Sequence, residues 1–126
     1  DKADASMFEE VAKSLQSVAG GLILIGPSSA WATNLGKKYD NVYLIGSKTP
    51  AEVPAYLIHS DIGLMLYDHS KTSVYYGQNP LKLYEYAAAG LAILSTPHRE
   101  FEFINPPNFS CIHMTTICQG GLCEML

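Results

Sequence analysis

Short apolar runs recur along this chain and limit the folds that are open to it. Each run is bounded by turn residues and is continuously apolar, which is typical of parallel strands buried on both faces. Five such runs are present: Gly21–Gly26, Asn41–Gly46, Asp61–Tyr67, Leu91–Ser95 and, less clearly, Phe109–Met114. We therefore expect a buried sheet of parallel strands.

Segments with helical character separate these runs. Apolar residues at helical spacing predict helices at 6–19, 29–39, 50–60 and 80–89. The first of these helices would open with a capping box of Ser6 and Glu9. This alternation predicts an α/β fold, a Rossmann-like parallel sheet of about four to five strands with helices on both faces.

The length and composition suit one folded domain, residues 1–126. Of the 126 residues, 48% are hydrophobic and 16% are charged. Doubly wound nucleotide-binding domains open on a strand, whereas this sequence opens on a helix. We therefore expect the first strand of the domain to lie upstream of residue 1.

Charge and cysteine usage argue against several classes of protein. A formal net charge of −4 disfavours nucleic acid as a partner. No apolar run reaches the roughly 20 residues of a membrane span, and no signal peptide is recognisable, so we expect a cytoplasmic protein or one peripheral to a membrane through its parent enzyme. The three cysteines, Cys111, Cys118 and Cys123, are an odd number and suggest no disulfide framework, so we expect a reducing compartment. Together with His113 they lack the paired spacing of structural zinc sites, so we expect no metal site.

The front of the helix at 80–89 has the features of a binding site. Asn79 suits the capping position and Pro80 the first helical position. The amides of Leu81, Lys82 and Leu83 then have no acceptor within the helix, and with the helix dipole they favour an anion. The apolar stripe expected to pack toward the sheet comprises Leu81, Leu83, Tyr84, Ala87 and Ala88.

Two charged residues of this helix, Lys82 and Glu85, occupy positions where neither the helix dipole nor capping stabilises them. Lys82 opposes the dipole by roughly 0.3 to 1 kcal/mol, and Glu85 is too far into the helix to serve as a capping acid. The two could form an i, i+3 ion pair on a solvated face. We favour the alternative, in which Lys82 contacts a bound anion and Glu85 accepts hydrogen bonds from the hydroxyls of a sugar.

A long loop precedes this helix. It runs over 14 positions, from Tyr67 to Pro80, whereas strand-to-helix connections usually have about two to six. Long loops at the carboxyl edge of a sheet are commonly functional. Tyr67, at the end of its strand, is therefore a candidate ligand contact, whereas solvation alone explains His69 and Lys71.

The segment NPLKLYEYAAAGLAILST resembles the signature helix of GT-B glycosyltransferases, in which a Pro-x-Lys-hydrophobic-aromatic-Glu-Tyr-x-x-x-Gly run follows a strand and loop of the donor-binding domain. NVYLIGSKTPAEVPAYLIHSDIGLMLY is similar to the segment before that helix, and the match runs from about Gly21 to Thr96. The resemblance implies a truncated GT-B C-terminal domain of the group 1 type, which binds a nucleotide-sugar donor.

The resemblance also implies roles for individual residues. Leu81 and Lys82 would contact the diphosphate of a UDP- or GDP-sugar, and Glu85 would accept hydrogen bonds from the ribose hydroxyls. Gly46 and Ser47 would meet the edge of the base through backbone groups. The other donor-site positions would be Tyr67, Gln78, Asn79 and Pro80.

The resemblance implies a substrate and a partner, and this sequence differs from the family's pattern at two points. The substrate is a nucleotide-diphospho-sugar with no further cofactor, and the partner is an N-terminal acceptor domain expected outside this chain. Many retaining members carry a second glutamate eight positions before the one matching Glu85, and here that position is Gly77. The phosphate-clamping Arg and Lys from the first strand and its loop have no counterpart. We therefore expect weak nucleotide binding, with no transfer to a polysaccharide or glycolipid acceptor by this chain alone.

Two other functions stay open at this stage. A nucleotide-sugar epimerase shares the same two-domain plan and would act without an acceptor. A non-catalytic flavodoxin-like binding module would need clustered acidic residues at strand ends, whereas Asp61 precedes its strand and Asp68 stands alone.

Overall fold

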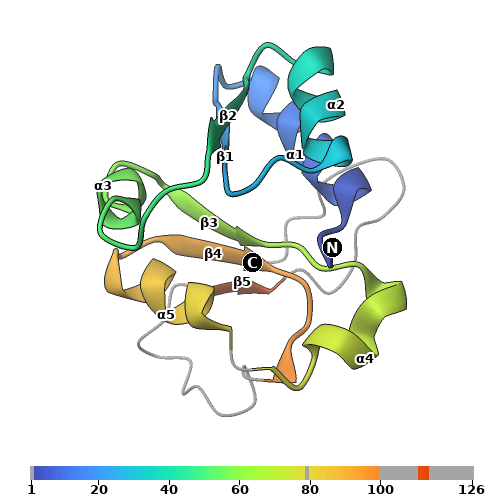
Figure 1. Cartoon of the computed structure of the whole chain (residues 1–126), viewed down its shortest axis with the longest axis vertical. Coiled ribbons are helices and arrows are strands. Elements are labelled where there is room, and N and C mark those ends of the chain that lie inside the picture. Colours follow the sequence, from blue (N-terminus) through green and yellow to red (C-terminus); the bar gives the residue numbers. More distant parts are fainter. Residues whose placement is uncertain (1, 79, 100–110, 114–126) are drawn as a thin grey trace. The chain divides into compact units, whose positions relative to one another are not determined.

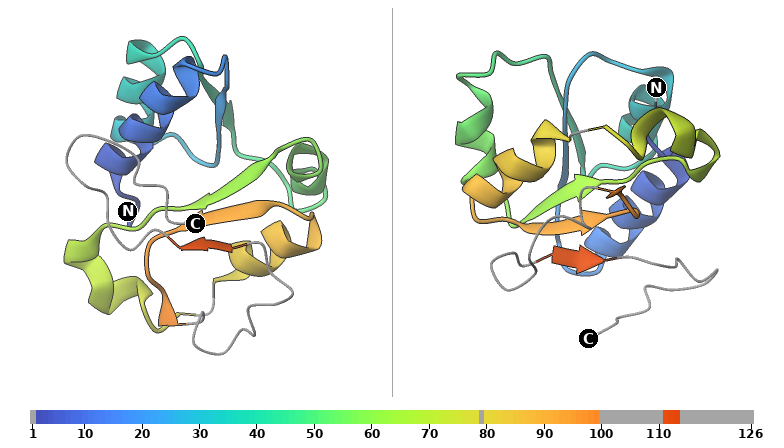
Figure 2. Two further views of the ribbon diagram at one scale, coloured as in Figure 1. Left: turned by 180° about the vertical axis from the view of Figure 1, so that it is seen from behind. Right: turned by 90° about the horizontal axis from the view of Figure 1, so that it is seen from below.

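Alternating helices and parallel strands make up the computed structural model of this chain (Figure 1, Figure 2). It describes residues 2–78, 80–99 and 111–113. The chain forms two compact units. The first comprises Ala3–Tyr56, and the second begins at Leu57 and also includes Lys2.

The first unit is built on two parallel strands, β1 (Leu22–Ile25) and β2 (Val42–Gly46). The helices α1 (Ala5–Gln16) and α2 (Ala30–Lys38) lie next to each other on one side of these strands (Figure 1). The side chains that they bury are Phe8, Ala12, Ala32 and Leu35. These contacts form the apolar centre of the unit.

The two faces of β1 and β2 are buried to different extents. Leu22 and Val42, which pair in the ladder, are buried, whereas the next pair, Ile23 and Tyr43, is 45% and 52% exposed. Successive strand residues point to opposite faces, so one face is covered and the other is about half open. The predicted burial of these strands on both faces is therefore not found.

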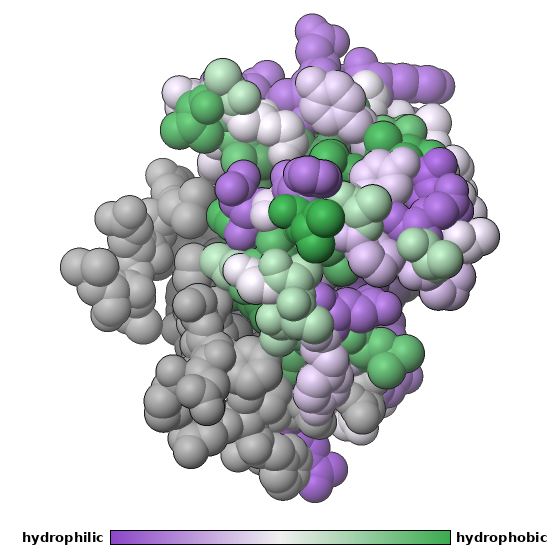
Figure 3. Space-filling view, turned by 90° about the vertical axis from the view of Figure 1, so that its left-hand side faces the viewer, coloured by the Kyte–Doolittle hydropathy of each residue, from purple (hydrophilic) through white to green (hydrophobic). Residues whose placement is uncertain are grey.

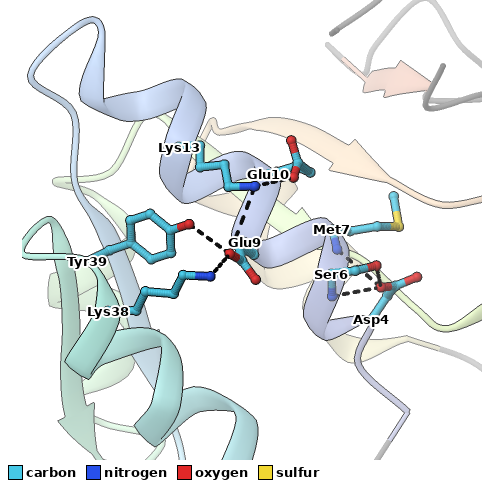
Figure 4. Close-up of polar contacts among 8 residues, drawn as sticks. All are labelled: Asp4, Ser6, Met7, Glu9, Glu10, Lys13, Lys38 and Tyr39. Atoms are coloured by element: carbon cyan, nitrogen blue, oxygen red, sulfur yellow. Dashed lines mark hydrogen bonds and ion pairs between the residues drawn. The ribbon is translucent and has the colours of Figure 1, made fainter. Parts of the chain in front are cut away.

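The start of α1 is closed by an acidic residue (Figure 4). Asp4 Oδ1 accepts hydrogen bonds from the amides of Ser6 and Met7 at 3.0 and 3.1 Å. Asp4 is therefore the cap, and the predicted capping box of Ser6 and Glu9 is wrong. The helix begins at Ala5, so the strongly capping Asp immediately before it takes the position instead.

Glu9 connects α1 to the end of α2 (Figure 4). Its carboxylate accepts hydrogen bonds from Lys38 Nζ at 2.6 Å and from Tyr39 Oη at 2.7 Å. These two donors hold the pKa of the Glu9 carboxyl below its usual range. The polar side chains at this end of the first unit are thus occupied by one another.

The second unit holds a three-stranded parallel sheet. Its strands are arranged in the order β3 (Ile62–Met65), β4 (Ala92–Ser95) and β5 (Cys111–His113). Gly63 lies opposite Ile93 in the ladder between β3 and β4. A buried cluster of Met65, Tyr67, Tyr75, Leu83 and Ile93 forms the core of the unit.

One helix precedes these strands, and a turn and two further helices lie between β3 and β4. Their bounds are α3 (Val53–Leu57), a 3-10 turn at His69–Lys71, α4 (Thr72–Tyr75) and α5 (Leu81–Ala88). The turn and α4 divide the long loop after β3. α5 follows that loop and packs against β3 and β4.

The α/β fold with alternating helices and parallel strands is confirmed, and the described strands form two sheets instead of one. None of the described helices is both long enough and apolar enough to span a membrane. Apolar side chains at the surface lie among polar ones (Figure 3). Cys118 and Cys123, two of the three cysteines weighed as metal ligands, lie outside the described residues.

Candidate functional site

The front of α5 differs from that of α1. Pro80 occupies the capping position, with φ −83° and ψ 100°, and among the described residues no side chain accepts a hydrogen bond from the first turn. The helix therefore begins at Leu81, one residue later than predicted, because Pro80 has an extended backbone. Asn79, the predicted cap, lies outside the described residues.

This shift changes which amides are available. The amide of Leu83 donates to the carbonyl of Pro80 at 2.9 Å, so its predicted availability is wrong. The amides of Leu81 and Lys82 have no acceptor among the described residues. Within the described part of the chain, these two N–H groups at the positive end of the helix dipole are left for an anion.

The buried face of α5 differs from the predicted one. Leu83 is fully buried and Tyr86 is partly buried, whereas Leu81 is 72% exposed and Tyr84 is 41% exposed. The predicted stripe of Leu81, Tyr84 and Ala88 therefore does not pack against the sheet. Leu83, with Tyr86, takes that role.

A glycine in β3 selects this face. A Cβ on Gly63 would lie 2.3 Å from Cδ2 of Tyr86, so the ring fits against the strand because Gly63 has no side chain. Tyr86 Oη also donates to the carbonyl of Leu64 at 3.4 Å. Burial raises the pKa of the Tyr86 phenol to about 12, so it stays a neutral packing group.

Lys82 and Glu85 lie exposed on α5. Neither forms an ion pair within 4.0 Å in the described part of the chain, so the i, i+3 ion pair considered for them is absent there. Surrounding protein atoms limit the hydration of the Lys82 ammonium, and this effect lowers its pKa although the side chain reaches the surface. The charge of Lys2 lowers the pKa further, and that of Glu85 opposes both effects.

Lys2 brings a second cation to this site. Its Nζ donates to Gln78 Oε1 at 2.7 Å and lies 5.4 Å from the ring centroid of Tyr67. Its backbone carbonyl accepts a hydrogen bond from the Asp68 amide at 2.9 Å. Sequence reasoning missed Lys2 because no local pattern links it to a loop more than sixty positions later.

Tyr67 is held in place by the end of β4. Its amide donates to Thr96 Oγ1 at 3.1 Å, and that hydroxyl donates to the carbonyl of Met65 at 3.2 Å. The Tyr67 ring stacks on Tyr75 at 4.8 Å and is 7% exposed. Burial, with the nearby Tyr75 phenol, raises the pKa of the Tyr67 phenol. Tyr67 is thus mainly a core residue, with Lys2 over its ring.

The second unit contains six of the predicted residues. These are Tyr67, Gln78, Pro80, Leu81, Lys82 and, one turn further along α5, Glu85. Gly46 and Ser47 belong to the first unit, and their contact with a base stays a prediction. Gly46 has φ +79° and Ser47 is exposed.

Gly77 lies one residue before Gln78 in the exit of the loop. It is exposed, its φ lies outside the left-handed region, and a Cβ built on it would meet nothing within 4 Å. The position expected to carry a second acid in retaining glycosyltransferases thus has room for a side chain.

No protein-family model, curated protein or solved structure matches this chain. Any assignment of function therefore rests on the residues of this site and their surroundings.

Proposed function

We propose that this chain is the nucleotide-sugar-binding half of a glycosyltransferase, a Rossmann-like donor domain of the GT-B type. The observation that carries the proposal is the first turn of α5. It presents two amides without acceptors, the Lys82 ammonium and the Glu85 carboxylate, and none of these groups has a partner among the described residues. Local helix stability accounts for neither charge at these positions.

A diphosphate suits the front of this helix. The amides of Leu81 and Lys82 donate along the helix axis, and the positive end of the dipole favours negative charge. The Lys82 ammonium adds a point charge, and Lys2 adds another close enough to lower the Lys82 pKa. An anion would relieve the repulsion between these two cations.

Glu85 suits a pair of hydroxyls. An ionised carboxylate accepts hydrogen bonds through both oxygens and donates none, so it can hold the two adjacent hydroxyls of a ribose. One helical turn separates Glu85 from Lys82 on the same face of α5. A ribose and the diphosphate attached to it would then be bound by neighbouring parts of one helix.

In transfer, the bond between the sugar and the diphosphate breaks, and the nucleoside diphosphate leaves with the electron pair. Negative charge then develops on the diphosphate oxygens, where the free amides, Lys82 and Lys2 would stabilise it. The hydroxyl oxygen of an acceptor substrate forms the new bond to the sugar, and the group that removes its proton would come from an acceptor domain. This chain should therefore bind donors without transferring sugar.

Isothermal titration of UDP and GDP against the chain tests this proposal. We expect Lys82→Met to weaken nucleoside diphosphate binding by about tenfold or more, the usual effect of losing a hydrogen bond to a charged group, and to leave nucleoside binding nearly unchanged. Lys37→Met is the matched control, because Lys37 is an exposed lysine of the first unit. Equal affinity of the parent chain and Lys82→Met for both diphosphates would remove the diphosphate assignment.

The ribose assignment has a separate test. Glu85→Gln should weaken binding of UDP, and the loss should disappear with an analogue that lacks both ribose hydroxyls. A loss that persists with this analogue would assign Glu85 another role.

The two alternative functions have tests of their own. If the whole enzyme epimerises a labelled donor without an acceptor, the nucleotide-sugar epimerase is favoured instead. Absence of any nucleotide binding would favour the non-catalytic module.

A further inference from the structure

We propose that Lys2 is a strap that closes the loop before α5. The strap consists of Lys2 and its contacts with Tyr67, Asp68 and Gln78. Asp68 lies at the start of the loop and Gln78 at its end, so one residue from the far end of the sequence holds both ends together. The strap is a property of the second unit, and its effect on ligands rests on the proposed function.

The start of the loop is fixed independently of its exit. Asp68 Oδ1 accepts from the Ser70 amide at 2.9 Å and from Ser70 Oγ at 2.7 Å, which stabilises the 3-10 turn. Tyr75, at the end of α4, is fully buried and stacks on Tyr67. The middle of the loop is therefore anchored in the core.

The exit of the loop, residues 76–78, is anchored at its backbone and at Tyr76. The Tyr76 amide donates to the carbonyl of Thr72 at 2.9 Å, the Tyr76 carbonyl accepts from the Arg99 amide at 3.3 Å, and the Gln78 amide donates to the carbonyl of Tyr75 at 3.0 Å. The Tyr76 ring packs against the core cluster and stacks on His98. The Gln78 side chain is exposed, and its Oε1 accepts a hydrogen bond from Lys2 Nζ. Because α5 begins three residues after Gln78, the position of this exit influences where the free amides of the helix point.

The chemistry of the strap suits a reversible contact. Lys2 forms no ion pair in the described part of the chain, and the groups that it contacts there are a neutral amide oxygen, a backbone amide and the face of a ring. An ammonium has three donors, and the Gln78 bond uses one. Lys2 can thus hold the exit of the loop and still face the anion for which Lys82 is placed.

Amide hydrogen exchange in the ligand-free chain tests the strap. Lys2→Met keeps a side chain of similar length and removes the ammonium, so we expect the Tyr76 and Arg99 amides to exchange about 5- to 30-fold faster. Lys2→Arg should retain most of the protection, because its guanidinium can still donate to Gln78. Lys37→Met should leave both amides unchanged.

A double-mutant cycle tests whether the faster exchange comes from loss of the contact between Lys2 and Gln78 or from separate destabilising effects of the two substitutions. Gln78→Met removes the acceptor, and its effect on the Tyr76 amide should match that of Lys2→Met. The double variant should exchange no faster than either single variant, because both remove the same contact. Unchanged exchange in Lys2→Met, or effects that multiply in the double variant, would overturn the strap.

These measurements need no ligand, so the strap and the proposed function can fail independently. A chain that exchanges as expected and binds no UDP retains the strap and loses the nucleotide assignment. A chain that binds UDP through Lys82 and shows no change in exchange in Lys2→Met retains the function and loses the strap.

Discussion

The first turns of α1 and α5 differ in what their polar groups contact. At α1, the Asp4 carboxylate accepts from two of the free amides, and Glu9 is paired with Lys38. At α5, none of the described side chains caps the helix, and none of them forms an ion pair with Lys82 or Glu85. The polar groups at the start of α1 are bonded within the fold, whereas those at the start of α5 have no partner among the residues that the structure describes.

This difference indicates where to look for function in a small α/β chain. Charged residues such as Glu9 are accounted for by the contacts that they make with their own fold. Lys82 opposes the dipole of its own helix and gains no described partner in return. Departures from local rules that the fold does not compensate are expected at binding sites.

The largest effect on stability is expected on the face of α5 that packs against the sheet. Leu83→Ala should lower the free energy of unfolding by about 2 to 5 kcal/mol, because it empties a fully buried position. Leu81→Ala is the matched control and should change it by less than about 0.5 kcal/mol. Urea unfolding with an unchanged m-value measures both, and equal losses would contradict the observed orientation of the helix.

A smaller effect is expected at the cap of α1. Asp4→Ala should cost about 0.5 to 2 kcal/mol, because the amides of Ser6 and Met7 lose their acceptor. Asp4→Asn should retain most of the stability, since Asn caps helices about as well as Asp. Unfolding midpoints of the two variants provide the comparison. A loss as large in Asp4→Asn as in Asp4→Ala would show that charge, and not capping, is what Asp4 supplies.

At the start of α5, replacing a charged residue should raise the free energy of unfolding instead of lowering it. Lys82→Met should stabilise the ligand-free chain by about 0.3 to 1 kcal/mol, because it removes a cation from the positive end of the helix. The folded chain lowers the pKa of Lys82 below the ordinary 10.5, so the penalty is present at neutral pH and fades as the pH rises through the folded pKa toward 10.5. Unfolding at pH 7 and near pH 10.5 should show the gain disappear; a gain that persists would exclude this electrostatic cause.

The smallest effect on stability is expected at Gly77. Gly77→Glu should change the free energy of unfolding by less than about 0.5 kcal/mol, because its Cβ would point into open space at an ordinary φ. If the chain binds nucleotide-sugars, the added carboxylate should improve binding of a UDP-sugar more than binding of UDP. Equal changes for both ligands would place residue 77 away from the sugar.

Local sequence patterns predicted part of this structure. The apolar runs identified the parallel strands, including the weak one at 109–114, which contains Cys111–His113. The strongly helical character of 80–89 identified α5 to within about two residues, the usual uncertainty of helix ends. Such patterns depend on neighbours in the sequence, which is why they could be read directly.

Features set by distant residues could not be predicted in this way. The buried face of α5 depends on Gly63, which admits the Tyr86 ring and leaves Leu81 outside. The division of the strands into two sheets depends on which ladders form between segments far apart in the sequence. Lys2 reaches the site through the path of the chain and carries no motif of its own.

The lowered pKa of Lys82 has a consequence for the covalent chemistry of this chain. An amine reacts with acylating and aldehyde reagents in its neutral form, and a lower pKa increases the fraction of that form at a given pH. Lys82 is also at the surface, where a reagent can reach it. It should therefore be modified ahead of Lys13 and Lys38, whose pKa values are raised by hydrogen bonds to Glu10 and Glu9, and the front of α5 is then a position for attaching a probe or a crosslinker.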